Sequence, residues 1–199
     1  MRLARILMTT FTALVLAATA VHAADLKNAD ASDLDRLSQA LNSIQTLKGD
    51  FVQIDPSGDV EQGKVYIDKP GRMRFEYAAP SPTLVVSDGL DVAVFNSKLN
   101  TADRYPLSAT PLNILLSNHV NLKQNKNVIG LEHQPGALVV KARSNDRRMT
   151  GNISIVFSDP GLELRQWTTV DAQGLATTVS VRNLQTGIPL QPELFLTHG

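Results

Sequence analysis

Along most of the chain, apolar and polar residues alternate with a period of two. This is the period of a β-strand that has one buried and one solvated face. The alternating runs are short, and they are separated by turn sequences rich in Pro, Gly, Asp and Ser, which favours antiparallel hairpins. The expected strands span residues 48–55, 63–68, 72–77, 83–87, 91–96, 127–133, 137–143, 152–158, 162–170 and 175–183.

Two segments have a helical pattern instead. Between residues 30 and 49, apolar residues recur at spacings of three and four, which is typical of an amphipathic helix. Asp30 and Ser32 offer capping oxygens at its start, and we expect it to end near Gly49. Residues 110–117 begin with Thr-Pro and are almost entirely apolar, which predicts a second, short helix. The expected fold is therefore mainly β (α+β), a large antiparallel sheet, curled or partly closed, with helices on one side.

The N-terminus has the pattern of a secretory signal peptide. Residues 1–5 include two arginines, residues 6–20 are apolar, and residues 21–23 place small residues where a signal peptidase cuts. A membrane anchor would need roughly 20 continuous apolar residues. We therefore expect cleavage after Ala23, export from the cytoplasm, and one mature domain over residues 24–199.

Composition removes several classes of function. The 199 residues include 19 basic and 19 acidic side chains, and this zero net charge argues against a nucleic-acid-binding protein. The chain has no cysteine. Disulfides, thiolate metal sites, a cysteine nucleophile and an N-terminal lipidated cysteine are thereby excluded.

Catalytic motifs are also missing. The sequence contains no H-E-x-x-H, G-x-S-x-G or G-x-G-x-x-G pattern. Residues 58–64 match the G-x-x-x-x-G-K part of a phosphate loop, but Val65 stands where a hydroxyl is needed and a strand follows instead of a helix. We expect no catalytic site, no metal site and no cofactor, and hence no enzyme.

The apolar residues of the strands suggest a lipid-binding surface. Met73, Phe75 and Tyr77 share one face of their strand, and neighbouring strands are expected to extend it through Val65, Ile67, Leu84, Val86, Val92 and Val94. Two helices are too few to cover a sheet of about ten strands. Part of a concave apolar face would therefore stay uncovered and could bind an acyl chain. An ordinary core beneath a helix is the alternative interpretation.

Three segments carry a resemblance to a known family. They are Gly-Asp-Phe-Val-Gln at 49–53, Lys-Pro-Gly-Arg-Met-Arg-Phe-Glu-Tyr at 69–77 and Leu-Val-Val-Ser-Asp-Gly at 84–89. In this order and spacing they resemble the LolA family of periplasmic carriers of outer-membrane lipoproteins. The resemblance covers residues 33–118, and beyond it only strand pattern and length agree.

The resemblance implies an unclosed half-barrel with helices as a lid over an apolar cavity. It also implies a periplasmic monomer that takes acylated lipoproteins from an inner-membrane ABC transporter and passes them to an outer-membrane receptor or the outer membrane. In the family, the positions of Met73 and Phe75 face the cavity, and those of Leu112 and Leu115 lie on the lid. The expected ligand-binding residues are Phe51, Val65, Ile67, Met73, Phe75, Tyr77, Leu84, Val86, Leu112 and Leu115.

The resemblance also implies a latch. The family's basic residue before the proline bonds to the lid backbone, and here Lys69 replaces the usual Arg. Lysine is a point charge on a flexible stem, so we expect a looser latch or one shared with Arg72 or Arg74. Leu90 and Ala93 stand where the family commonly has Lys and Trp.

Two functional alternatives stay open. The chain is expected to be a lipoprotein carrier whose helix 110–117 fills the empty cavity as a surrogate ligand and offsets acyl-chain burial. The alternative is a LolA-like periplasmic protein that binds another lipid, or senses an acylated ligand. A lipid-anchored receptor relative is excluded because such a protein needs an N-terminal cysteine.

Overall fold

The computed structural model describes residues 16–110, 112–143 and 151–197. The chain divides into two units, residues 1–33 and 34–199. The described part of the first unit is helical and belongs to α1 (Leu16–Ser43), whose last residues lie in the second unit. No helix in the described ranges has the length and apolar character that a membrane span requires. Residues 1–15 of the expected signal peptide lie outside the described residues, so its cleavage stays a prediction.

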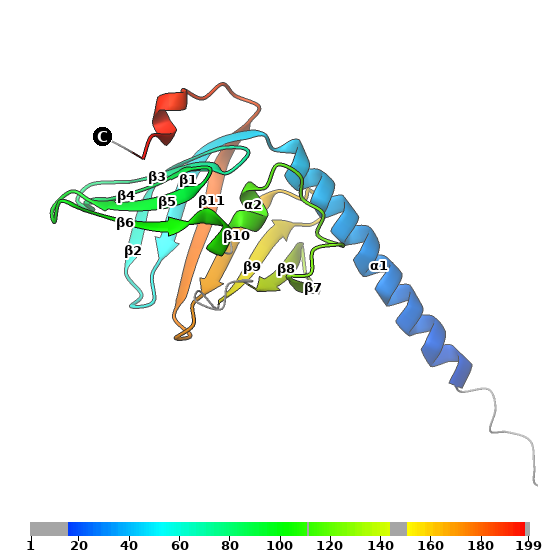
Figure 1. Ribbon diagram of the computed structural model, residues 1–199. Coiled ribbons are helices and arrows are strands. Elements are labelled where there is room, and N and C mark those ends of the chain that lie inside the picture. Colours follow the sequence, from blue (N-terminus) through cyan, green and yellow to red (C-terminus); the bar gives the residue numbers. More distant parts are fainter. Residues whose placement is uncertain (1–15, 111, 144–150, 198–199) are drawn as a thin grey trace, which may run out of the picture. The chain divides into compact units, whose positions relative to one another are not determined.

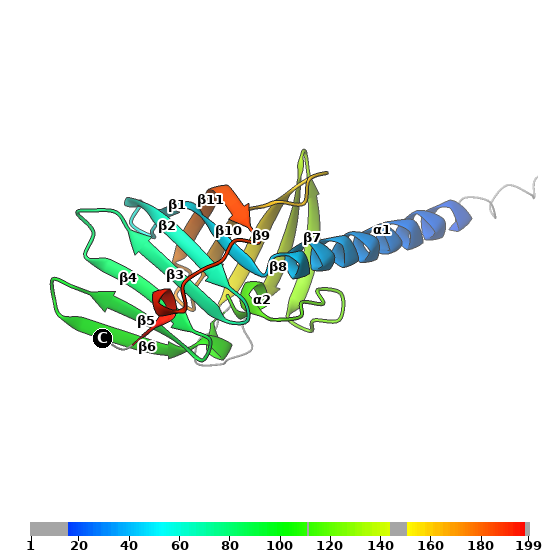
Figure 2. The ribbon, with the colours of Figure 1, turned by 90° about the horizontal axis from the view of Figure 1, so that it is seen from above.

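The second unit is built on one antiparallel sheet, which is strongly curved and unclosed (Figures 1 and 2). Its strand order is β6-β5-β4-β3-β2-β1-β11-β10-β9-β8-β7, so β1 and β11 join two runs of consecutive hairpins. The strands are β1 (Thr46–Ile54), β2 (Val60–Asp68), β3 (Arg72–Tyr77), β4 (Thr83–Asp88), β5 (Asp91–Asn96), β6 (Thr101–Pro106), β7 (Val128–Gln134), β8 (Ala137–Arg143), β9 (Asn152–Ser158), β10 (Leu164–Val170) and β11 (Ala176–Thr186).

The mainly β prediction is confirmed, with corrections to individual elements. Helix α1 starts before Asp30 and ends at Ser43, not near Gly49, which lies in β1. The short helix expected over 110–117 is reduced to α2 (Asn113–Leu116), with residue 111 outside the described ranges, and a separate 3-10 helix, η1 (Leu107–Ala109), precedes it. Strand β6 and the 3-10 helix η2 (Pro192–Phe195) had no counterpart in the sequence pattern.

One face of the sheet, which we call the interior face, carries the core. In the antiparallel register Phe75 lies opposite Val65, and Met73 lies opposite Ile67, so all four side chains share this face. Figure 1 shows α2 on the same side of the sheet. The helical residues in this core cluster are Leu37, Leu41, Leu107, Ile114, Leu115 and Leu116.

The opposite side, which we call the outer face, is also partly covered. The 3-10 helix η2 contacts β3 and β4 there, and Phe195 within it is buried. Placing every helix on one side was therefore wrong for η2, although it holds for α2. Two polar positions of β3 explain the difference, because Arg72 and Arg74 hold the C-terminal segment, as described below.

Candidate functional site

Aromatic rings occupy the centre of the interior face. The ring of Phe51 lies edge-on to those of Phe75 and Tyr77, at centroid distances of 4.9 and 5.0 Å. Phe75 in turn lies 6.0 Å from Trp167 of β10, again edge-on. Such edge-to-face pairs are favourable because the positive edge of one ring meets the negative face of the other. Three residues of this aromatic cluster, Phe51, Phe75 and Tyr77, are among the predicted ligand-binding residues.

Tyr77 gives this cluster one polar end. Its hydroxyl donates to Oε1 of Gln53 at 2.8 Å. Burial raises the pKa of Tyr77 to about 12, so the phenol is neutral at physiological pH. The interior therefore carries no charge at this position, which suits an apolar ligand.

Helix α2 covers part of the interior with Ile114, Leu115 and Leu116, and it is the helix expected to form the lid. The backbone N–H of Gly71 donates to the carbonyl of Leu116 at 2.8 Å, and this bond ties the lid to the β2–β3 turn. Gly71 has φ +76°, and a Cβ there would lie 2.6 Å from Cα of Gly89, so the close approach requires glycine. Leu115 is 4% exposed and belongs to the core, whereas Leu112 is half-buried at its margin.

The segment after the lid is fixed to α1 by polar side chains. The amide of Asn42 both donates to the carbonyl and accepts from the N–H of Val120, at 2.9 and 2.8 Å. One turn earlier, the hydroxyl of Ser38 accepts from the N–H of Leu122 at 3.0 Å. Sequence reasoning missed both residues. Their signal was a polar pair spaced by four beside the apolar stripe Leu37–Leu41.

Lys69 lies at the end of α1. Its ammonium donates to the carbonyl of Leu41 at 2.7 Å, within the last turn of the helix, where cationic side chains are favourable. Lys69 is only 7% exposed, and desolvation lowers its pKa from 10.5 to about 8. The lid-to-turn bond expected of this position is made instead by the backbone of Gly71.

Arg72 and Arg74 point away from the lid. The guanidinium of Arg72 pairs with Asp68 at 2.5 Å and lies 5.6 Å above the ring of Phe195. Arg74 donates through Nη1 to the carbonyl of Leu194 at 3.0 Å. The prediction that these arginines share a lid latch is wrong, because the alternation of β3 places them on the outer face. They hold the C-terminal segment instead.

The pairing register of β4 shows that the predictions for Leu84 and Val86 were wrong. Val85 lies opposite Phe75, so Leu84 and Val86 fall on the outer face and do not extend the apolar interior as predicted. Val86 is fully buried there, on the face against which η2 packs. Continuing across the sheet, Val92 and Val94 do return to the interior face, because Val94 lies opposite Val85.

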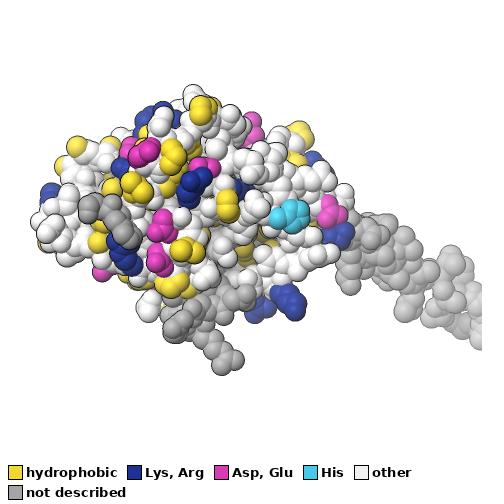
Figure 3. Space-filling view, turned by 45° about the horizontal axis from the view of Figure 1, so that its top comes forward, with side chains coloured by type: hydrophobic (Ala, Val, Ile, Leu, Met, Phe, Trp, Pro, Cys, Tyr) yellow, Lys and Arg dark blue, Asp and Glu magenta, His cyan; other side chains and the backbone are white. Residues whose placement is uncertain are grey.

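The interior is filled by the protein's own side chains in this state. Val65 and Met73 are 0% and 2% exposed, and lid residues lie in the same core cluster. On the face shown in Figure 3, hydrophobic side chains are scattered among polar ones rather than gathered in one hollow. A ligand would therefore have to displace part of this core. Among the described residues, no group of three or more His, Asp or Glu is placed to hold a metal ion.

Comparison with known proteins decides the family. Residues 42–198 match the family model described as "Outer membrane lipoprotein carrier protein LolA". The chain belongs to the LolA family. The resemblance of the three sequence segments is thereby confirmed, and the family's role in lipoprotein transport follows from its name.

Individual LolA relatives match over most of their length. The outer-membrane lipoprotein carrier protein of Methylococcus capsulatus is 30% identical over 176 residues, which is 84% of each chain. That of Cupriavidus pinatubonensis is 26% identical over 193 residues, covering 90% of this chain and 89% of the relative. A solved LolA superfamily structure from Nitrosomonas europaea covers 84% of this chain and 98% of its own, with 12% identity and a TM-score of 0.46.

Proposed function

We propose that this LolA protein is a periplasmic chaperone that shields lipoprotein acyl chains. It would receive acylated lipoproteins from an inner-membrane ABC transporter and deliver them to an outer-membrane receptor. The observation that carries the proposal is the single apolar face that continues from β5 through β3 and β1 to β10 and β8, covered by a short separate lid. Export of a mature domain of residues 24–199, with cleavage after Ala23, would place it in the periplasm.

The energetics of acyl binding explain why the lid belongs to the core. Burial contributes roughly 0.8 kcal/mol per methylene, so one sixteen-carbon chain would gain on the order of 10 kcal/mol in an empty pocket. A carrier with such affinity for several chains would not release them. Because Ile114, Leu115 and Leu116 are buried in the closed state, their displacement opposes binding and offsets part of that gain.

The hydrogen bonds around α2 support one particular lid motion. One side of the lid is tied by the bond from Gly71 to Leu116, which breaks when the helix lifts. Beyond it, the bonds from Asn42 to Val120 hold the following segment on α1. We infer that the lid swings about this fixed point, and that Met73, Phe75 and the neighbouring rings then contact the acyl chains.

The identity of the cargo tests the proposal. The protein would be purified from its native periplasm without detergent, and the molecules bound to it would be identified by mass spectrometry. Peptides carrying an acylated N-terminal cysteine support the carrier. Another lipid, free of peptide, would establish the alternative binding function, and a protein that carries neither would contradict both.

A second measurement tests whether the protein binds and solubilises a lipoprotein. A purified triacylated lipoprotein would be mixed with the protein, the detergent removed, and the mixture separated by size-exclusion chromatography. The carrier is expected to keep the lipoprotein in a soluble one-to-one complex. Aggregation of the lipoprotein in the presence of the protein would be evidence against the proposed function.

A further inference from the structure

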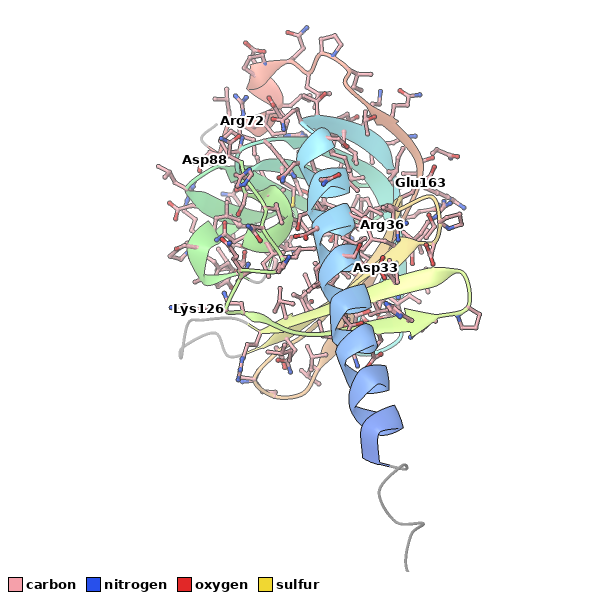
Figure 4. All side chains as sticks on the ribbon, turned by 90° about the vertical axis from the view of Figure 1, so that its right-hand side faces the viewer. Asp33, Arg36, Arg72, Asp88, Lys126 and Glu163 are labelled. Atoms are coloured by element: carbon pink, nitrogen blue, oxygen red, sulfur yellow. The ribbon has the colours of Figure 1, made fainter. Side chains whose placement is uncertain are left out.

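A pocket outside the aromatic cluster lies between the end of α1 and strands β10 and β11. Its volume is about 380 Å³, within the usual range of roughly 300–1,000 Å³ for ligand pockets. Figure 4 shows Glu163, which lines this pocket, near Arg36 of α1, whereas Lys126 lies on the other side of the helix. The apolar side chains that line it are Ala40, Ile44, Leu162, Leu164 and Leu184.

A shift in strand pairing builds the floor of this pocket. The register between β1 and β11 shifts between Lys48 and Asp50, which leaves Gly49 in the irregular position. A Cβ on Gly49 would lie 2.5 Å from Cδ2 of Leu184, so the leucine covers the bare backbone. Leu184 is half-buried against the core and separates the pocket from the interior.

One lining residue has an unusual backbone conformation. Leu162 and Asn183 have φ values of +52° and +54°, in the left-handed region that asparagine adopts readily and leucine rarely. The N–H of Leu162 donates to the carbonyl of Ser158 at 2.8 Å, which fixes the turn. Strained residues of this kind persist where the surroundings hold them, and they are frequent at ligand sites.

The mouth of the pocket is positively charged. Arg165 and Arg182 line it and are exposed, whereas the leucines beneath are half-buried or buried. Glu163 pairs with Arg165 at 2.7 Å. Across the strand pair from Arg182, Asp50 forms an ion pair with Lys64. The charged residues that line the pocket are Glu163, Arg165 and Arg182, and their sum is one positive charge.

We propose that this pocket binds one single-chain anionic amphiphile, a fatty acid or a lysophospholipid. Its chain lies against Ile44, Leu162 and Leu184, and its anionic head is held by Arg165 and Arg182. The inference is independent of the proposed carrier function, since the site lies outside the closed aromatic cluster. A carboxylate and a phosphate head share the chemistry that the arginines recognise.

Methyl NMR of the purified protein tests the site directly. Dodecanoate and lauroyl lysophosphatidylglycerol would be titrated below their micellar concentrations, with zwitterionic lauroyl lysophosphatidylcholine as the comparison ligand. The methyl signals of Ile44, Leu162 and Leu184 are expected to shift and saturate. The tighter of the two anions identifies the source, and the zwitterion is expected to bind about tenfold more weakly.

Charge-removing variants provide the matched control. The double variant Arg165→Gln/Arg182→Gln is expected to weaken anion binding about tenfold, and Lys98→Gln/Lys126→Gln, which removes two exposed cations elsewhere, is expected to leave it unchanged. Shifts confined to interior methyls such as Ile67, or equal binding of the zwitterion, would overturn the proposal. Failure of the carrier function is separable, because it is measured by lipoprotein retention and not by these signals.

Discussion

The rings of Phe75 and Trp167 lie 6.0 Å apart although their strands are four positions apart in the sheet. Neighbouring strands are spaced by about 4.8 Å, so the same strands in a flat sheet would be about 19 Å apart. The sheet therefore curls until its two halves meet across the interior. In the proposed carrier function, an acyl chain that enters the interior has to separate these rings.

Because Trp167 is the single tryptophan of the chain, it reports on this separation. An acyl chain that enters the interior is expected to contact Trp167, which is 3% exposed in the closed state. A lipoprotein or fatty acid with a brominated chain should therefore quench most of the tryptophan fluorescence, since bromine quenches on contact. The same ligand without bromine serves as the control. Unquenched emission at saturating ligand would show that acyl chains bind elsewhere.

Adjacent residues of β4 test which face is the binding face. The chain has no cysteine, so Val85→Cys and Leu84→Cys each introduce a unique thiol, one on the interior face and one on the outer face. Both positions are half-buried. Bound acyl chains are expected to slow maleimide labelling of Val85→Cys about tenfold or more and to leave Leu84→Cys unchanged. Protection of the thiol at 84 instead would contradict the register.

The two strands β3 and β4 show what the sequence could and could not predict. Strand β3 alternates strictly between polar and apolar residues. This alternation alone predicted that Met73 and Phe75 share the buried face. Strand β4 has three consecutive apolar residues because both of its faces are covered, the interior by the core and the outer face by η2. The alternation of residue types therefore could not show whether Val85 or its neighbours face the interior. The pairing of Val85 with Phe75 shows that Val85 does.

The sequence could not predict the long-range contacts for a different reason. The contact between Phe75 and Trp167 depends on the curl of the whole sheet, which no local pattern encodes. Strand β6 was missed because all six of its residues are exposed and it therefore lacks alternation. The residues of the lid were predicted from composition and the family resemblance, but the anchoring role of Asn42 requires the spatial proximity of Val120.

The C-terminal segment is expected to stabilise the sheet without affecting acyl binding. Phe195 is 2% exposed beneath Arg72, on the face opposite the aromatic cluster. Phe195→Ala should lower the free energy of unfolding by about 3 kcal/mol, which is the usual cost of emptying a buried phenylalanine site. Urea unfolding measures this loss, and bromine quenching of Trp167 should be unchanged. Weaker quenching in a folded variant would place the ligand on the outer face.

Weakening the lid should strengthen retention of cargo. Leu115→Asp places a charge in the core, so α2 is expected to leave the interior, and the free energy of unfolding should fall by about 3 kcal/mol. Leu112→Asp, at a half-buried position, should have a smaller effect in the same direction. Since the lid no longer competes, bound lipoprotein should transfer to acceptor liposomes more slowly.

Leu99→Asp is the matched control for these lid variants, because Leu99 is 70% exposed on the β5–β6 turn. It should change neither stability nor transfer. Circular dichroism checks that the sheet persists in each variant. Unfolding of the sheet by Leu115→Asp, or transfer as fast as in the unmodified protein, would refute the role of α2 as a competing ligand.

Lys69 should make stability depend on alkaline pH. Its pKa is about 8 in the folded protein because of desolvation, against 10.5 when exposed, so the unfolded chain binds more protons between these values. The free energy of unfolding contributed by Lys69 should therefore rise as the pH increases from 8 to 10.5. The neutral amine still donates to Leu41, so deprotonation removes the cost of burying the charge without losing the bond.

Two replacements of Lys69 isolate this effect from other titrating groups. Urea unfolding would be measured from pH 7 to 10.5 for the unmodified protein, Lys69→Met and Lys69→Arg, and the differences compared. The unmodified protein should gain stability relative to both variants above pH 8, because methionine does not titrate and arginine stays charged throughout. A difference that is flat across this range would mean that the ammonium of Lys69 is hydrated. Its bond to α1 would then contribute little to holding the helix over the interior.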